Sequence, residues 1–342
     1  MKSYAFDWYR SVLLLTLSAF ALAVGSTGCG NTTAKPPSIP DTFQGEYPFL
    51  VVCTTGMVAD AVRQVGGDHV SVLEADGEQL KQGGAHIRIV QLMGEGTDPH
   101  LYKASPGDLS LLEKADLIFY SGLHLEGKLT DLFERMAQRK PTFAVAEPLE
   151  TADDSQLLSV ADGYHDPHIW FDVSLWSETV DVVAEQLAKF DADHAADYRA
   201  NAKTYREELA DLHTYCQQQI ATIPEKRRVL VTAHDAFHYF GRAYGLKVMA
   251  TQGISTNAQA STKHIDELVE FIVSRGIKAV FSESTINERT IQVLIDGCQA
   301  RGQTVKIGGE LFSDAMERPG TAKGTYVGMV RHNVDTIVRA LK

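Results

Sequence analysis

Three histidines stand in sequence contexts that suit metal binding. The tripeptide Asp-Pro-His occurs twice and ends at His100 and at His168, and His234 directly follows a strand-like apolar run. Because proline fixes its own φ and restricts the residue before it, each tripeptide presents its imidazole from a rigid turn. Imidazole nitrogen is a common ligand of Zn²⁺ and related ions, so these three positions are candidate metal ligands.

A carboxylate accompanies each of these histidines. Asp98 and Asp166 begin the two tripeptides, and Asp235 follows the third histidine. A metal-bound imidazole usually donates its second ring N–H to a carboxylate or a carbonyl, so these aspartates are candidate partners for that N–H. Taken singly, any of the 12 histidines is more often a surface residue or a hydrogen-bonded core residue. The sequence context that these three histidines share favours a metal site.

Short β-rich runs alternate with helical segments along the chain. We expect strands over residues 49–54, 70–73, 87–93, 117–120, 142–145, 229–232, 247–250, 279–282 and 304–307. Strands separated by single helices imply parallel sheets covered on both faces, which is an α/β fold. Ligands bind at the carboxyl ends of the strands in such sheets, and His100 and His234 fall at that side.

A long segment without Pro or Gly, residues 175–222, is rich in good helix formers. A single helix of about 45 residues would be about 65 Å long, longer than one domain is wide. We therefore predict an N-terminal α/β lobe over 47–174, a linking helix over 175–222 and a C-terminal α/β lobe over 223–342. The alternative is two or three shorter helices with a break around Asp191 to Asp193.

The first 28 residues have the features of a signal peptide. Lys2 and Arg10 precede a 14-residue apolar run, 11–24. This run is too short for a stable membrane anchor. The small residues before Cys29 resemble the lipobox of bacterial lipoproteins, although Ser26 replaces the usual leucine. Lipidation of Cys29 is expected, and ordinary signal cleavage is the alternative. Residues 29–46 are expected to form a flexible tether.

Composition excludes several other classes of protein. The formal net charge of −12 argues against a nucleic-acid-binding protein, because such affinity comes from Lys and Arg. The chain has no C-x-x-C pair, so a zinc ribbon or a thioredoxin-like redox site has no support. We expect Cys53 to be a small core residue, and a bond between Cys216 and Cys298 is open.

Five separated motifs resemble the metal-binding solute-binding proteins of ABC transporters, the TroA/ZnuA-like family, and most closely its TroA-type branch. They lie, in the family's order, at residues 96–108, 121–129, 166–170, 231–237 and 311–316. The resemblance covers roughly residues 48–342. It implies two Rossmann-like (β/α)4 lobes joined by one long rigid helix, with the metal held in the cleft between the lobes.

The resemblance also implies a ligand set. Its two ligands from the N-terminal lobe fall on His100 and His168, the third on His234 and the fourth on Asp314. Three imidazoles and one carboxylate suit Zn²⁺ first. Mn²⁺ is the second candidate, because it prefers oxygen ligands. The other acidic candidates near the cleft, Glu283 and Glu288, are expected to support the site or to lie at a helix N-terminus rather than to bind the ion.

Two features depart from the family pattern. Residues 74–86 look like an insertion before the first ligand turn, and this would bring His86 near the mouth of the cleft. The segment between His124 and His165 lacks the long His-rich and acid-rich loop of many zinc-specific relatives. The first departure leaves the strand register uncertain, and the second removes support for a metal-scavenging flap.

The implied function is capture of Zn²⁺ or Mn²⁺ outside the cytoplasm and delivery to an ABC permease and its ATPase. The carrier is expected to be a monomer that the lipid on Cys29 anchors to the membrane. The alternatives are a metal-dependent adhesin and a zinc hydrolase; the hydrolase is disfavoured, because catalytic zinc keeps one position open for water. Residues 122–129 nearly match a phosphate-binding loop, but Leu129 stands where Ser or Thr is required.

Overall fold

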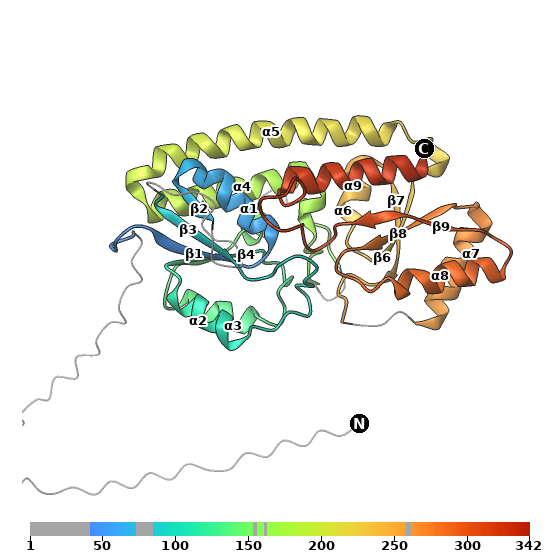
Figure 1. Ribbon diagram of the computed structural model, residues 1–342, viewed down its shortest axis with the longest axis horizontal. Coiled ribbons are helices and arrows are strands. Elements are labelled where there is room, and N and C mark those ends of the chain that lie inside the picture. The colour runs from blue at the N-terminus through green and yellow to red at the C-terminus, as the bar shows by residue number, and fades with distance from the viewer. Residues whose placement is uncertain (1–41, 73–84, 153–155, 161–162, 258–260) are drawn as a thin grey trace, which may run out of the picture. The chain divides into compact units, whose positions relative to one another are not determined.

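The N-terminal part of the chain folds around a parallel five-stranded sheet (Figure 1). The computed structural model describes residues 42–72, 85–152, 156–160, 163–257 and 261–342. The strand order is β2-β3-β1-β4-β5. The strands are β1 (Phe49–Cys53), β2 (Val70–Val72), β3 (Ile87–Gln91), β4 (Leu117–Tyr120) and β5 (Thr142–Ala144).

Helices cover both faces of this sheet, and the central strand β1 shows why. Every residue of β1 is buried, and successive side chains of a strand point to opposite faces. Phe49, Val51 and Cys53 join a core with residues of α1 and α4, whereas Leu50 and Val52 pack with residues of α2 and α3. These helices are α1 (Gly56–Gly66), α2 (Pro106–Lys114), α3 (Thr130–Ala137) and α4 (Val173–Phe190).

The C-terminal part is a second α/β lobe built from two parallel strand pairs. Strand β6 (Val229–His234) pairs with β7 (Lys247–Gln252), and β8 (Ala279–Glu283) pairs with β9 (Lys306–Leu311). The pairs lie side by side, because β6 contacts β8. The helices here are α6 (His238–Tyr244), α7 (Thr262–Arg275), α8 (Arg289–Ala300) and α9 (Tyr326–Leu341). All nine predicted strands are therefore present in a two-lobed α/β fold.

The single helix predicted over residues 175–222 is wrong. The chain forms α4, which ends at Phe190, then a 3₁₀ turn (Ala192–His194) and a second helix, α5 (Ala195–Ala221). The two helices pack along each other (Figure 1). The break lies where the alternative of separate helices put it.

The side chain of Asp191 explains this break. The residue is 2% exposed, and its backbone leaves the helical region at φ −118° and ψ 77°. Its carboxylate accepts hydrogen bonds from the hydroxyl groups of Tyr47, at 2.6 Å, and Tyr198, at 2.5 Å. These two bonds hold the carboxylate at the end of α4, where the chain turns without Pro or Gly.

The helix α5 connects the two lobes. It contacts α1 of the N-terminal lobe, and α6 and α9 of the C-terminal lobe. One hydrophobic cluster includes residues of both lobes together with residues of α4 and α5. The lobes therefore share a hydrophobic core along these two helices and are not joined by a single isolated helix.

The cysteines within the described residues are all unpaired. Cys53, Cys216 and Cys298 are buried and free, so the bond considered between Cys216 and Cys298 is absent. Cys53 lies in the core, as expected. Among the described helices, none is long and apolar enough to cross a membrane. Cys29, the signal peptide and most of the tether lie outside the described residues.

Candidate metal centre

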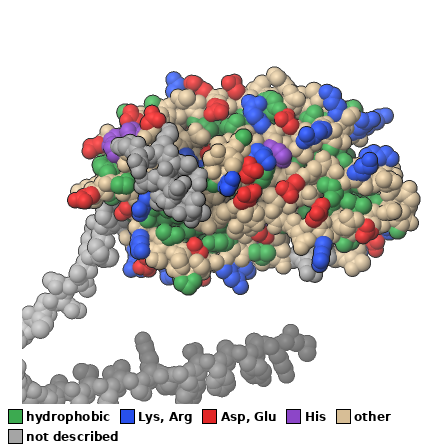
Figure 2. Space-filling view, in the orientation of Figure 1, with side chains coloured by type: hydrophobic (Ala, Val, Ile, Leu, Met, Phe, Trp, Pro, Cys, Tyr) green, Lys and Arg blue, Asp and Glu red, His purple; other side chains and the backbone are tan. Residues whose placement is uncertain are grey.

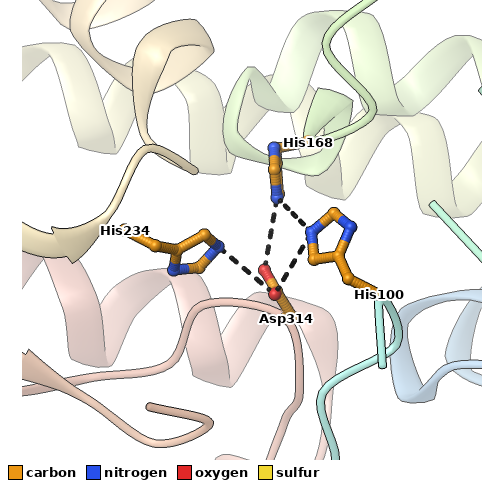
Figure 3. A group of neighbouring side chains, drawn as sticks. All are labelled: His100, His168, His234 and Asp314. Carbon is orange, nitrogen blue, oxygen red and sulfur yellow. Dashed lines mark hydrogen bonds and ion pairs between the residues drawn. The ribbon is translucent and has the colours of Figure 1, made fainter. Parts of the chain in front are cut away.

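The structure brings together the four side chains proposed as ligands: His100, His168, His234 and Asp314. One donor atom from each lies within 4.8 Å of the donor atoms of the other three. None of the four residues is more than 5% exposed. Figure 3 shows the three imidazole rings directed toward the Asp314 carboxylate.

Both Asp-Pro-His units build the same local turn. The carboxylate of Asp98 accepts a hydrogen bond from the backbone N–H of His100 at 2.9 Å, and that of Asp166 accepts one from His168 at 3.0 Å. An aspartate that binds the backbone two residues on fixes a tight turn. Each turn holds its histidine within the N-terminal lobe, as the repeated tripeptide predicts.

The other two side chains come from the C-terminal lobe. His234 is the last residue of β6, and Asp314 follows the end of β9 at Leu311. Both positions lie at carboxyl ends of parallel strands, where α/β proteins hold their ligands. The four donors are therefore divided equally between the lobes.

The distances among the donors leave a polar centre that lacks a partner. Nε2 of His234 lies 3.3 Å from Asp314 Oδ2, and Nε2 of His168 lies 3.5 Å from Asp314 Oδ1. Nε2 of His100 lies 3.2 Å from Nε2 of His168. His234 Nε2 and both Asp314 oxygens are buried without a hydrogen-bond partner among the described residues. Buried polar atoms normally have partners, so this group fits a bound cation.

Two carboxylates orient the rings from behind. Oδ1 of Asp166 lies 2.7 Å from Nδ1 of His168. One oxygen of Glu283 pairs with Nδ1 of His234, and the other accepts the backbone N–H of His234 at 2.8 Å. Both contacts leave Nε2 of the ring free to face the centre, as metal-bound histidines require. The supporting position expected for Glu283 is present.

Asp98 and Asp235 were expected to hold the rings of His100 and His234, and neither does so. Asp98 accepts from the backbone of His100, and its other oxygen accepts from the Thr256 hydroxyl at 2.6 Å. Asp235 points away from His234 and pairs with Nε2 of His238 at 2.9 Å. A residue at a strand end alternates its direction with its neighbour, so adjacency in sequence did not imply contact. No motif in the sequence pointed to Thr256 as a partner of Asp98.

Burial and neighbouring charges act in opposite directions on the pKa values of this centre. Burial lowers the pKa of His100 to about 4. Burial also acts to lower the pKa of His234, but the carboxylates of Glu283 and Asp314 raise it well above its usual value. For Asp314 burial favours the neutral form, and the three histidines, His234 foremost, hold its pKa far below normal. Asp314 therefore stays an anionic donor at neutral pH.

A cavity of about 580 Å³ lies beside the centre. It is lined by His100, His124, Tyr164, His165 and Ile254, among others. These residues come from segments of both lobes, so the cavity lies between the lobes. Of the four donor residues, His100 lies in its lining.

The segment that resembles a phosphate-binding loop is filled by a carboxylate of the protein itself. Glu126 accepts hydrogen bonds from the backbone N–H groups of Ser121 at 2.8 Å and Gly122 at 3.2 Å. It also accepts from the Thr54 hydroxyl at 2.6 Å. A phosphate needs such N–H groups free, so this loop is not suited to nucleotide binding.

The expectation that His86 lies near the cleft mouth is wrong. His86 directly precedes β3, so it lies at the amino end of that strand, whereas the metal centre lies at the carboxyl ends. It contacts His69 and His194 there. Residues 73–84, the main part of the expected insertion, lie outside the described residues.

Two α/β lobes that share four buried metal-type donors define a solute-binding protein for a metal ion. The chain belongs to the ZnuA family, described as the periplasmic component A of a zinc-uptake complex, which matches residues 81–340. The members of this class bind solutes and are not enzymes.

Individual relatives are named as metal-binding proteins. The manganese-binding lipoprotein MntA of Bacillus subtilis is 43% identical over 317 residues, 92% of this chain and 95% of that protein. The zinc-binding protein TroA of Treponema pallidum is 46% identical over 292 residues, 85% of this chain and 88% of that protein. The manganese ABC transporter substrate-binding lipoprotein PsaA of Streptococcus pneumoniae is 25% identical across 97% of this chain and 98% of that protein.

The fold of a solved structure agrees with the two-lobed arrangement. The periplasmic zinc-binding protein TroA from Treponema pallidum has a TM-score of 0.78 and 44% sequence identity. The match covers 87% of this chain and 99% of that chain. The similarity therefore includes both lobes and the helices between them.

Proposed function

We propose that this protein captures one Zn²⁺ ion outside the cytoplasm, with Mn²⁺ as the second choice, and delivers it to an ABC permease driven by its ATPase. The ligands are His100, His168, His234 and Asp314. The observation that carries the proposal is the group of buried donor atoms without hydrogen-bond partners, above all both oxygens of Asp314. A divalent cation satisfies them together.

The donor chemistry supports the order of the metals. The relatives are named for zinc in one case and manganese in others, so their names do not choose between the two ions. Three imidazole nitrogens favour Zn²⁺ by the Irving–Williams order, and Mn²⁺ prefers oxygen donors. The carboxylates of Asp166 and Glu283 also raise the basicity of their imidazoles, which strengthens binding of Zn²⁺.

Release of the ion requires that the lobes move apart or that the ligand loops shift. His100 and His168 belong to the N-terminal lobe, and His234 and Asp314 belong to the C-terminal lobe. The indole N–H of Trp170 donates to the carbonyl of Ser313 at 3.0 Å, directly beside Asp314. Because this hydrogen bond joins the lobes at the site, we assign Trp170 a positioning role for the fourth ligand.

The anchor follows from the N-terminal sequence and from the relatives that are named lipoproteins. We propose that Cys29 carries the lipid, that residues 29–46 form the tether and that the protein is a monomer facing the periplasm or the cell surface. Mass spectrometry of the mature N-terminus tests the lipid. Cys29→Ser is expected to release the protein from membranes, and a membrane-bound Cys29→Ser variant contradicts this part of the proposal.

Metal competition tests the proposed function directly. The ion in protein purified from its native cells is identified first, and Zn²⁺ then competes with Mn²⁺ for the wild type and for His234→Glu. We expect the wild type to hold Zn²⁺ more tightly and the variant, with one more oxygen donor, to shift toward Mn²⁺. A wild type that prefers Mn²⁺ overturns the metal order, and a wild type that binds neither ion overturns the function.

A further inference from the structure

A second group of three histidines lies at the amino ends of the N-terminal strands, remote in the fold from the metal centre. His69 ends a 3₁₀ turn before β2, His86 directly precedes β3, and His194 ends the turn between α4 and α5. One ring nitrogen of each lies within 4.8 Å of those of the other two. Three separate segments of the chain thus bring their imidazoles to one point.

The rings lie on a partly open surface. Their centroids are 4.1 Å apart for His86 and His194, 4.7 Å for His69 and His194, and 5.1 Å for His69 and His86. The side chains of His69 and His194 are 21% and 19% exposed. Figure 2 shows histidine and acidic side chains on the surface near the turn between α4 and α5. The rings of His69 and His194 are therefore partly open to solvent.

Carboxylates already hold two of the three rings by one nitrogen. Oδ2 of Asp191 lies 2.9 Å from Nδ1 of His194, and Oδ2 of Asp197 lies 3.0 Å from Nε2 of His69. Each carboxylate leaves the second ring nitrogen available, and this is the arrangement that carboxylates produce behind metal-bound histidines. Nδ1 of His86 is buried and has no hydrogen-bond partner among the described residues.

The carboxylate of Asp191 is itself fixed in place. The hydroxyl groups of Tyr47 and Tyr198 donate to it, and the residue is buried. A ring held by such a carboxylate loses little freedom when an ion binds, which favours binding. The same residue that ends α4 thus orients one of the three imidazoles.

We propose that His69, His86 and His194 form a second Zn²⁺ site, in which water completes the coordination. Three imidazoles and a water ligand give the tetrahedral set that zinc accepts. The site joins the turn between α4 and α5 to the edge of the sheet, so its ion stabilises the N-terminal lobe. It does not depend on the transport function, because it shares no residue with the metal centre.

The test removes the first site so that the second can be measured alone. The reference protein is the full mature chain with His168→Ala and Asp314→Asn. Zn²⁺ is titrated by calorimetry and by competition with a chromophoric chelator. We expect two ions per wild-type chain, one per reference chain and none when His86→Ala and His194→Ala are added. His332→Ala in the reference is the matched control, because His332 contacts the Glu310 carbonyl on another face, and it is expected to keep one ion.

Two further measurements guard against a variant that simply misfolds. Asp197→Asn leaves all three histidines in place and is expected to weaken Zn²⁺ binding by the reference about 10- to 100-fold. Co²⁺ added to the reference is expected to give the visible absorption of a tetrahedral site. One ion per wild-type chain, or one ion retained after His86→Ala and His194→Ala, overturns the second site and leaves the first untouched. If the wild type binds Zn²⁺ at the second site but not at the first, the proposed function is wrong and the second site stands.

Discussion

The carboxylate of Glu283 holds His234 at two points. One oxygen accepts the backbone N–H of His234 at 2.8 Å, and the other pairs with its ring Nδ1. The first contact fixes the end of β6, and the second fixes the direction and the tautomer of the ring. The side chain that orients a metal donor therefore also sets the position of the backbone that carries it.

Removal of this charge is expected to weaken metal binding without unfolding the protein. Glu283→Gln keeps the shape of the side chain but lowers the basicity of His234, so Zn²⁺ affinity is expected to fall about 10- to 100-fold. Competition with a chelator at pH 7 measures the change. Glu288→Gln is the control, because Glu288 is exposed before α8. Equal affinities of the two variants would show that Glu283 does not support the ligand.

Chelation is expected to leave the fold intact. One hydrophobic cluster extends through both lobes and through α4 and α5, so the fold has a core of its own. An ion at 100 times its dissociation constant stabilises a protein by about 2.7 kcal/mol, which corresponds to a Tm roughly 5–10 °C higher. Circular dichroism melts with and without chelator measure both effects. An unfolded apoprotein would instead indicate a structural metal, the reading that suits an adhesin.

Two buried tryptophans allow a matched test of the lobe contact. Trp170→Phe removes the hydrogen bond to Ser313 and leaves a buried carbonyl unpaired, which is expected to cost about 1–3 kcal/mol. Zn²⁺ release, followed by stopped-flow with excess chelator, is expected to become faster, because Asp314 follows Ser313. Trp176→Phe makes the same change in size, but the Trp176 N–H has no partner among the described residues. Identical release rates for the two variants would rule out the positioning role.

A pH-dependent contribution to stability is expected from His238. Hydrogen bonds to Asp166 and Asp235 raise its pKa to about 10. A raised pKa means that the folded protein holds the proton more tightly than the unfolded chain. The stabilisation is therefore complete below about pH 6.5, the ordinary pKa of histidine, and is lost as the pH rises through about 10.

The variant His238→Gln tests this sign. Because the side chain is 38% exposed, we expect the pair to contribute only about 1 kcal/mol. Urea unfolding at pH 6 is expected to show the wild type as the more stable protein, and the difference is expected to shrink at pH 10.5. His264→Gln is the control, since His264 contacts a backbone carbonyl rather than a carboxylate. A difference that grows with pH would contradict the assignment.

Local patterns in the sequence were enough to predict the strands and to single out the three histidines. Runs of apolar residues placed β1 and β6, and the repeated Asp-Pro-His units predicted two turns that the structure shows. The proposed ligand Asp314 came only from resemblance, because a single carboxylate after a strand has no distinctive spacing. Its approach to His100 depends on how two lobes pack, and no local pattern encodes that.

The two errors have separate physical causes. The break at Asp191 depends on hydroxyl groups from Tyr47, 144 positions away in the chain, and from Tyr198, whose own helix had to turn back first. Helix propensity sums local preferences and cannot register such partners. His86 was misplaced because the expected insertion left the register uncertain, whereas His86 precedes β3 and lies at the amino end of that strand, away from the cleft.

The equal division of the four donors between the lobes makes ion binding and lobe separation a single linked equilibrium. By reciprocity, whatever free energy the ion contributes to holding the lobes together is the free energy by which any separation weakens its affinity. A permease that grips both lobes needs no direct access to the buried ligands. Under the proposed function, a displacement on the Asp314 side weakens binding of the ion and so favours its transfer.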